Sequence, residues 1–136
     1  MMKKILLLLA LLSMISLNAF SKKERYYADG FQFSRIKDGK ELDEMIDNRM
    51  RDREVPITID YDNKTIEVHS IHKDKYEMKK FIWENNMGDW RIRDFECTDL
   101  CGEKCTVSLY FNKKRGRIGI ITVGYTTRRW GYFIDN

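Results

Sequence analysis

Residues 57–70 read ITIDYDNKTIEVHS, and this stretch decides the fold of the chain. Apolar and polar residues alternate on both sides of Asp62-Asn63, a residue pair typical of a two-residue turn that tolerates positive φ. The alternation predicts a hairpin with one apolar and one polar face, as a half-buried hairpin requires. Its predicted partners are Ile57 with Val68, Thr58 with Glu67, Ile59 with Ile66, and Asp60 with Thr65.

The rest of the chain continues this β pattern outward from the hairpin. Further segments with strand periodicity or apolar runs are 26–36, 76–83, 90–97, 105–111, 118–125 and 130–134. Short polar stretches separate them, such as the predicted turns at 85–89 and 112–117. We therefore predict an all-β, antiparallel up-and-down meander of about seven to eight strands. The expected architecture is a small barrel, closed or nearly closed, of the kind that lipocalins form.

The segment from Gly39 to Arg53 departs from that pattern. Its apolar residues fall at i, i+3, i+4 and i+8, which places them on one stripe of a helix. They are Leu42, Met45, Ile46 and Met50. Asp38 followed by Glu41 is similar to a capping box. The pattern predicts one short N-terminal helix, and a loose charged excursion is the alternative.

The first residues have the order of an export signal. Lys3 and Lys4 precede an apolar run at 5–17, and the small residues Ala19 and Ser21 follow at cleavage spacing. About thirteen apolar residues are too few to cross a hydrocarbon core that needs roughly twenty. We predict a signal peptide at 1–21 and a single β domain at 22–136, secreted or periplasmic, with no transmembrane anchor after cleavage.

Charge and length restrict the classes of partner. The chain has 25 Lys and Arg residues against 21 Asp and Glu residues, a net charge of +4. Removal of Lys3 and Lys4 leaves +2, so the mature domain is nearly neutral and nucleic acid is not a favoured partner. About 115 residues are enough for one domain and too few for two.

Three cysteines fall at even spacing, at Cys97, Cys101 and Cys105. A hairpin turn centred on Cys101 sets Cys97 opposite Cys105, within disulfide reach, and it sets Phe95 opposite Val107. In an exported protein we predict a Cys97–Cys105 disulfide, with Cys101 as the free thiol at the tip. The alternative is that both opposed cysteines are reduced and buried. A metal site on a helix is disfavoured because the flanking residues predict strands.

No catalytic, cofactor or metal motif rises above background. His69 and His72 are three residues apart, which on a strand places them on opposite faces, so we expect solvated histidines. The acidic residues near Asp62 lack the glycine and the twelfth-position glutamate of a calcium loop. We therefore expect a protein that is not an enzyme and has no cofactor and no metal.

A compact basic turn lies between the last apolar segments. Lys113, Lys114, Arg115 and Arg117 form it. This turn is a candidate contact for an anionic surface. The alternative is a solvated turn whose basic residues discourage edge-to-edge pairing of the sheet.

The β region resembles a family of small uncharacterised exported proteins of Bacteroidota and their tailed phages. The likeness covers about residues 26–136. Its matching residues are Ile57-Thr58-Ile59-Asp60, Asp62-Asn63, Ile66-Glu67-Val68-His69-Ser70, Tyr76, Phe95-Glu96-Cys97-Thr98-Asp99, Gly102, Cys105, Tyr125 and Tyr132. Cys101 and the charged stretch at 39–53 are departures from it. The resemblance implies export and a β-rich fold, and it supplies no activity.

These observations predict an exported, non-enzymatic binding or interaction module of protein-contact or inhibitor type. Its partner would be a protein or an envelope or extracellular component. A carrier of a small apolar ligand inside the barrel is the alternative, and a small extracytoplasmic enzyme is the third. Interior size separates the first two, because a cavity of several hundred Å³ favours the carrier and a filled core favours surface contact.

Overall fold

The computed structural model describes residues 22–41, 46–47, 54–70 and 73–134. These residues form an all-β structure with nine antiparallel strands of five or more residues, two strands of two residues, and no helix. Within them there is accordingly no helix long and apolar enough to cross a membrane. The strands are β1 (Lys23–Ala28), β2 (Gly30–Lys37), β3 (Lys40–Glu41), β4 (Ile46–Asp47), β5 (Val55–Asp60), β6 (Thr65–His69), β7 (Lys73–Met87), β8 (Trp90–Thr98), β9 (Lys104–Asn112), β10 (Arg117–Gly124) and β11 (Arg128–Phe133).

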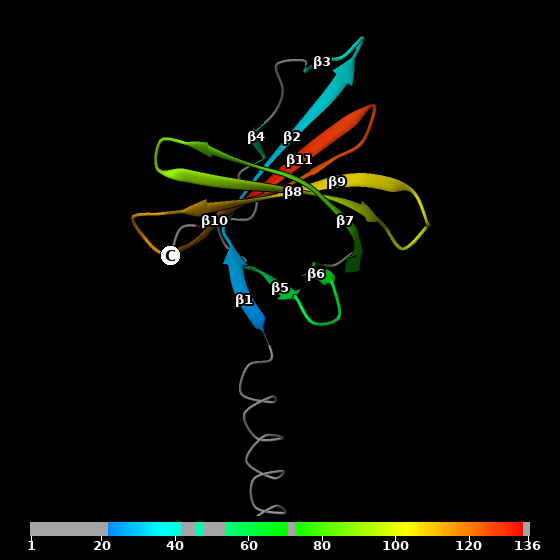
Figure 1. Ribbon diagram of the computed structural model, residues 1–136. Helices are drawn as coiled ribbons and strands as arrows, with labels where there is room; N and C mark the ends of the chain where they lie inside the picture. The colour runs from blue at the N-terminus through cyan, green and yellow to red at the C-terminus, as the bar shows by residue number, and fades with distance from the viewer. Residues whose placement is uncertain (1–21, 42–45, 48–53, 71–72, 135–136) are drawn as a thin grey trace, which may run out of the picture.

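The predicted antiparallel meander is confirmed from β5 to β11, where each strand pairs with its neighbour in sequence. Only Asp29 separates β1 from β2, yet these two strands pair at opposite ends of the meander, β1 with β5 and β2 with β11. The expectation of a small barrel requires a correction, because the sheet curls strongly and stays an open half-barrel (Figure 1).

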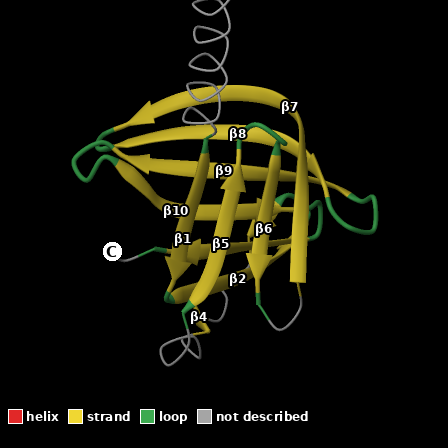
Figure 2. Cartoon of the chain, turned by 90° about the horizontal axis from the view of Figure 1, so that it is seen from below, coloured by secondary structure: helices red, strands yellow, loops and turns green. Residues whose placement is uncertain are grey.

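The curled sheet forms two layers that face each other. Figure 2 shows β1, β5 and β6 side by side, crossing β8, β9 and β10 at a steep angle. The long strand β7 passes from one layer to the other, because it pairs first with β6 and then with β8. Register shifts at two places along β7 accompany this bend, as β-bulges commonly do.

The register of residues 57–70 is as predicted at all four pairs, from Ile57 with Val68 to Asp60 with Thr65. The turn itself differs, because it comprises four residues and the positive φ falls on Lys64 rather than on Asp62 or Asn63. The Asp60 carboxylate fixes this turn, since it accepts hydrogen bonds from the Asn63 backbone and side-chain nitrogens at 3.1 and 2.8 Å.

The predicted helix at 39–53 is wrong where the structure describes the segment. Asp38 and Gly39 both have positive φ and form a two-residue hairpin turn, so Lys37 pairs with Lys40. The short strands β3 and β4 follow, and both pair with β2. An Asp-Gly pair is a strong hairpin signal, and here it overrides the capping-box pattern. Leu42, Met45 and Met50 lie outside the described residues, as does the predicted leader at 1–21.

Two further element boundaries differ from the sequence prediction. The single strand predicted at 26–36 is two strands, β1 from Lys23 to Ala28 and β2 from Gly30 to Lys37, separated by Asp29. The turn predicted at 85–89 is narrower, because β7 continues to Met87 and only Gly88 and Asp89 form the turn. Gly88 takes a φ of 58°, a conformation that residues with a Cβ rarely adopt.

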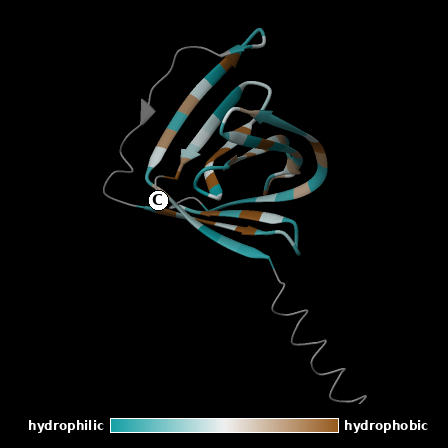
Figure 3. Cartoon of the chain, turned by 60° about the vertical axis from the view of Figure 1, so that its left-hand side comes forward, coloured by the Kyte–Doolittle hydropathy of each residue, from teal (hydrophilic) through white to brown (hydrophobic). Residues whose placement is uncertain are grey.

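The core lies between the two layers and is made of alternate residues of each strand. Brown and teal segments alternate along the strands in Figure 3, which is the period-2 pattern of a half-buried sheet. The largest side chains with almost no exposure are Tyr76, Ile57, Ile59, Ile66, Ile121, Val68, Val107 and Val123. Cys97 completes this set of nine, and the β5–β6 hairpin contributes four of them, which explains why residues 57–70 dominate the fold.

Candidate functional site

A cavity of about 460 Å³ occupies part of the half-barrel interior between β1 and the β8–β10 layer. Leu109 and Ile118, each 3% exposed, belong to both its lining and the core, so the cavity opens directly from the packed interior. Five basic residues and one acidic residue also line it. The basic ones are Lys22, Lys23, Arg91, Arg93 and Arg117, and the acidic one is Glu24.

On the β1 side of the cavity, the Glu24 carboxylate accepts hydrogen bonds from two tyrosine hydroxyls. Tyr26 Oη donates a hydrogen bond to Glu24 Oε2, and Tyr61 Oη donates to the same oxygen at 3.3 Å. Burial raises the pKa of both tyrosines above the ordinary value, and the neighbouring Glu24 charge raises it further. Both hydroxyls therefore stay protonated at neutral pH and remain donors to Glu24.

The β8 wall is cationic and lies against an aromatic ring. The Arg91 guanidinium lies 4.7 Å from the centroid of the Phe111 ring, a cation–π contact between paired positions of β8 and β9. Arg93 Nε donates to Glu84 Oε1 at 2.8 Å, and this hydrogen bond lowers the pKa of Glu84. Glu84 therefore interacts most closely with Arg93.

Arg91 is left with weaker pairing than Arg93. Its buried Nε makes no hydrogen bond among the described residues, and Glu84 Oε1 lies 3.6 Å away, which is an ion-pair distance. The Arg91 side chain as a whole is 37% exposed, so its outer nitrogens can still reach a bound group. One carboxylate thus faces two guanidiniums on this wall.

The residues of the predicted basic turn lie in two different places. Arg117 reaches the cavity, whereas Lys114 pairs with Asp89 at 3.3 Å at the tip. Asn112 Oδ1 accepts hydrogen bonds from the backbone nitrogens of Lys114 and Arg115, and Lys113 and Arg115 are exposed. Arg91 and Arg93 were not predicted as site residues. The sequence pattern that could have indicated them is their alternation with Phe95, which places all three side chains on one face of the strand.

A second feature is the outer edge of β7, opposite its β8-paired edge. The β6 ladder ends at Glu77 and Met78 N still donates to Lys64 O, but from Lys79 to Met87 this edge pairs with no other described strand. Four large apolar side chains are exposed here: Phe81 at 51%, Ile82 at 47%, Trp83 at 49% and Met87 at 58%. We call these four residues the β7 edge surface.

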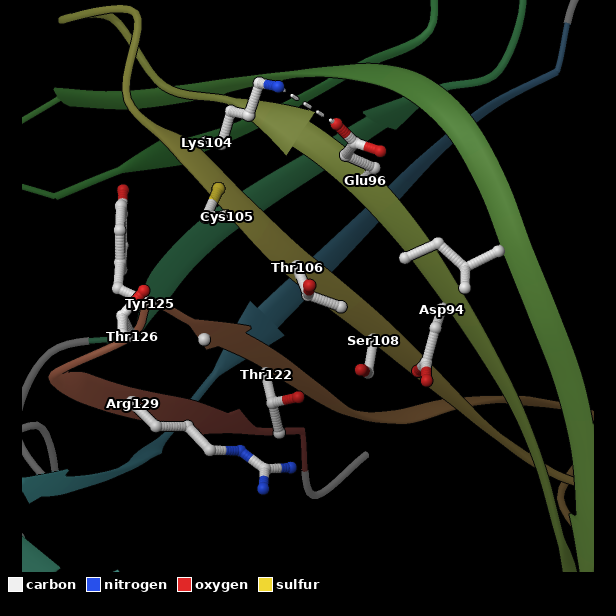
Figure 4. Close-up of a pocket in the computed structure, with 12 residues that line it drawn as sticks. Asp94, Glu96, Lys104, Cys105, Thr106, Ser108, Thr122, Tyr125, Thr126 and Arg129 are labelled. Atoms are coloured by element: carbon white, nitrogen blue, oxygen red, sulfur yellow. Dashed lines mark ion pairs between the residues drawn. The ribbon is translucent and has the colours of Figure 1, made fainter. Parts of the chain in front are cut away.

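A polar groove of about 590 Å³ covers the outer face of β8–β11 (Figure 4). Asp94, Ser108 and Thr122 are neighbours in register across three strands and line it. Its charges largely satisfy one another or neighbouring groups. Lys104 pairs with Glu96 at 3.9 Å, and Arg129 Nη2 donates to Tyr110 Oη at 3.3 Å. The groove thus has less unmatched charge to offer a ligand than the interior cavity has.

The predicted opposition of the two hairpin cysteines is confirmed in the register, where Cys97 pairs with Cys105 and Phe95 pairs with Val107. Both cysteines are buried, Cys101 is exposed at the tip, and all three are free thiols in this structure. Burial raises the pKa of Cys97 to about 12 and that of Cys105 to about 11. The disulfide itself stays a prediction.

Among the described residues, no three or more His, Cys, Asp or Glu side chains lie close enough together to hold a metal ion. His69 is exposed and lies 3.3 Å from Thr58 Oγ1, and His72 lies outside the described residues. Glu67 Oε2 lies 3.7 Å from the same ring nitrogen, His69 Nε2, so these three side chains lie together on the polar face of the β5–β6 hairpin.

The chain was compared with protein-family models, with curated proteins and with solved structures, and none of the three comparisons found a match. The resemblance to small exported proteins therefore stays a prediction.

Proposed function

We propose that the protein is an exported, non-enzymatic binding protein that contacts a partner protein through the β7 edge surface. The observation that carries this proposal is the run of Phe81, Ile82 and Trp83, each about half exposed, with Met87 further along the same edge of β7. The register sets Trp83 opposite Asp94 on the outer side of the sheet, whereas Phe81 is opposite Phe95 on the inner side. Exposed apolar residues scattered singly are ordinary, whereas a contiguous group marks an interaction site. Aromatic residues and methionine are also the types that interfaces favour.

The mode of contact follows from the neighbouring residues. Lys79 and Lys80 precede the apolar group, and two bulges interrupt β7 within it and before it. Lysines and bulges on an edge strand oppose the regular addition of another strand. The contact is therefore one of side chains in a partner's pocket, with Trp83 as the anchor, rather than a continuous shared sheet.

The test is affinity capture from the extracytoplasmic fraction of the source cells, read by mass spectrometry. The wild-type chain is compared with a double variant, Ile82→Ser with Trp83→Ser, and with Leu100→Ser as the control. Leu100 is 66% exposed and lies in the β8–β9 loop, so Leu100→Ser removes an exposed apolar side chain away from β7. Phe81 is left unchanged because its ring contacts Phe95, a cavity residue, at a centroid distance of 5.6 Å.

One stoichiometric protein, recovered with the wild type and the control and lost with the double variant, supports the proposal. Equal recovery with the double variant overturns it, as does recovery of no specific protein. Circular dichroism and urea unfolding of the double variant check that the fold is retained, because both substituted side chains are half exposed.

Export is tested separately by the mature N-terminus. The proposal expects the protein outside the cytosol with residues 1–21, or close to that number, removed. An intact leader on a cytosolic protein contradicts it.

A further inference from the structure

We propose that the interior cavity binds an amphiphilic anion: an acidic headgroup, carboxylate or phosphate, attached to an apolar body. Phe81 of the β7 edge surface contacts Phe95 of this cavity, but the binding of an anion here does not depend on a partner at that surface. The cavity volume of about 460 Å³ lies within the range of small-molecule sites. The cavity adjoins the packed core, since Leu109 and Ile118 belong to both.

The cavity lining is partly apolar and partly basic, whereas a carrier of a small apolar ligand would need a mainly apolar lining. Leu109, Ile118, Phe95 and Phe111 supply apolar walls. The basic residues around them outnumber the acidic ones by five to one. An uncharged apolar ligand would leave this excess of positive charge beside it, whereas an amphiphilic anion satisfies both parts of the lining.

The acidic groups near the cavity do not cancel this positive charge. Glu24 accepts hydrogen bonds from Tyr26 and Tyr61, and Glu84 pairs with Arg93 at 2.8 Å. Glu84 also lies 3.6 Å from Arg91, so a single carboxylate serves two guanidiniums. Asp60 faces Lys23 across the β1–β5 pair, but it does not line the cavity and it accepts hydrogen bonds from Asn63.

Arg91 is the residue best placed to receive the headgroup. Its guanidinium is supported by the Phe111 ring at 4.7 Å, and its Nε lacks a hydrogen-bond acceptor among the described residues. A planar guanidinium held against a ring offers a fixed fork of donors that suits a carboxylate or a phosphate. Arg117 approaches the same cavity from the start of β10 and adds a second cation.

The experiment is isothermal titration calorimetry of the purified protein with decanoate, and with decanol as the uncharged ligand of equal chain length. Three variants are compared: Arg91→Met, Arg117→Met, and Lys104→Met as the control. Lys104 is 80% exposed and lies beside the outer groove, so its removal changes the net charge equally without touching the cavity. Decyl phosphate is titrated as well, to distinguish a carboxylate from a phosphate headgroup.

We expect one saturable site for decanoate or decyl phosphate, bound at least tenfold more tightly than decanol. Arg91→Met should weaken the binding at least tenfold, Arg117→Met at least threefold, and Lys104→Met should leave it unchanged. Raising the ionic strength should weaken the binding of the anion and not that of decanol. If Arg91→Met does not fold, Arg117→Met still tests whether a basic residue of the cavity binds the anion.

The inference is overturned if neither decanoate nor decyl phosphate binds saturably. Equal affinity for decanol, or affinity unaffected by both arginine variants, overturns it too. The double variant Ile82→Ser with Trp83→Ser should bind the anion normally, and Arg91→Met should capture the partner protein normally. The two proposals can therefore fail independently.

Discussion

Tyr125 Oη donates a hydrogen bond to Asp99 Oδ2 at 2.7 Å, and this contact joins the residue after β10 to the loop between β8 and β9. The other carboxylate oxygen, Asp99 Oδ1, accepts from the backbone nitrogens of Cys101 and Glu103 at 2.9 Å each. One carboxylate thus holds the loop in shape and ties it to a neighbouring strand. The Tyr125 hydrogen bond is the largest of the effects that lower the pKa of Asp99.

The Asp99→Asn variant should lose stability at neutral pH and not in acid. Because the pKa of Asp99 is lower in the folded state, its contribution is present above the unfolded pKa of about 3.9 and is lost as the pH falls through the folded value. The amide keeps the acceptor oxygen for the loop but loses the charge. We expect a loss of about 1 kcal/mol at pH 7, estimated from hydrogen bonds to charged groups, and almost none at pH 2. Urea unfolding at the two pH values measures it, and an equal loss at both would contradict this assignment.

The three cysteines of the reduced protein should differ sharply in reactivity. The thiolate is the reactive form, and burial raises the pKa of Cys97 to about 12 and of Cys105 to about 11. Cys101 is exposed at the loop tip. Iodoacetamide at pH 8 should therefore label Cys101 first, and should label the other two only in denaturant. Mass spectrometry of the labelled peptides gives the order, and early labelling of Cys97 in the folded protein would contradict it.

Peptide mapping of the exported protein under non-reducing conditions tests the predicted disulfide. A Cys97–Cys105 bridge agrees with the register in which these two residues are directly opposed. Bridging across so short a loop should contribute about 2–3 kcal/mol if it is unstrained. A bridge that includes Cys101 would contradict the prediction, because the Asp99–Glu103 hydrogen bonds hold that residue at the tip.

Gly119 should be intolerant of alanine. It is the extra residue where the β9–β10 register shifts, and an added Cβ would lie 3.0 Å from Trp90 Cη2. We expect Gly119→Ala to cost about 1–3 kcal/mol in the free energy of unfolding, since the rigid ring has to move. Gly124→Ala is the matched control on the same strand, because its nearest neighbour would be 3.8 Å away. Chemical denaturation measures both variants, and equal effects would show that the Trp90 contact is unimportant.

The sequence predicts the hairpins well where the apolar alternation is continuous. Ile57, Ile59, Ile66 and Val68 can reach the core only in one register, because a shift by one residue would turn them all outward. The same reasoning aligns Cys97 with Cys105. The prediction fails at 38–41, where a helical spacing of later residues outweighed the turn chemistry of Asp38-Gly39. Turn chemistry is local and direct, whereas a four-residue apolar stripe arises easily by chance.

The cavity could not be predicted because its residues come from segments far apart in the chain. Glu24, Arg91 and Arg117 lie on three strands, and their proximity depends on how the sheet curls. Alternation along β8 sets Arg91 and Arg93 on the same face as Phe95, but it cannot show whether that face is filled at their position. The β7 edge surface is hidden for a related reason. The alternation at 76–83 predicts a strand, but it does not show that β6 ends before Trp83 and leaves this side chain half exposed.

Arg128 supplies the last prediction, because it contacts two rings and a carboxylate at once. Its guanidinium carbon lies 4.0 Å from the centroid of the Tyr125 ring and 5.9 Å from that of Trp130, and Nη2 lies 3.1 Å from Glu103 Oε2. Lysine can keep the ion pair but cannot lie flat against the ring. We expect Arg128→Lys to lower the free energy of unfolding by about 1 kcal/mol. An exposed ion pair alone contributes less than this.

A double-mutant cycle with Glu103→Gln separates the two contacts of Arg128. If the ring contact dominates, Arg128→Lys should cost nearly the same in the Glu103→Gln background as in the wild type. If the loss disappears in that background, the ion pair carries the effect, and the β8–β9 loop is held to β11 by charge rather than by stacking.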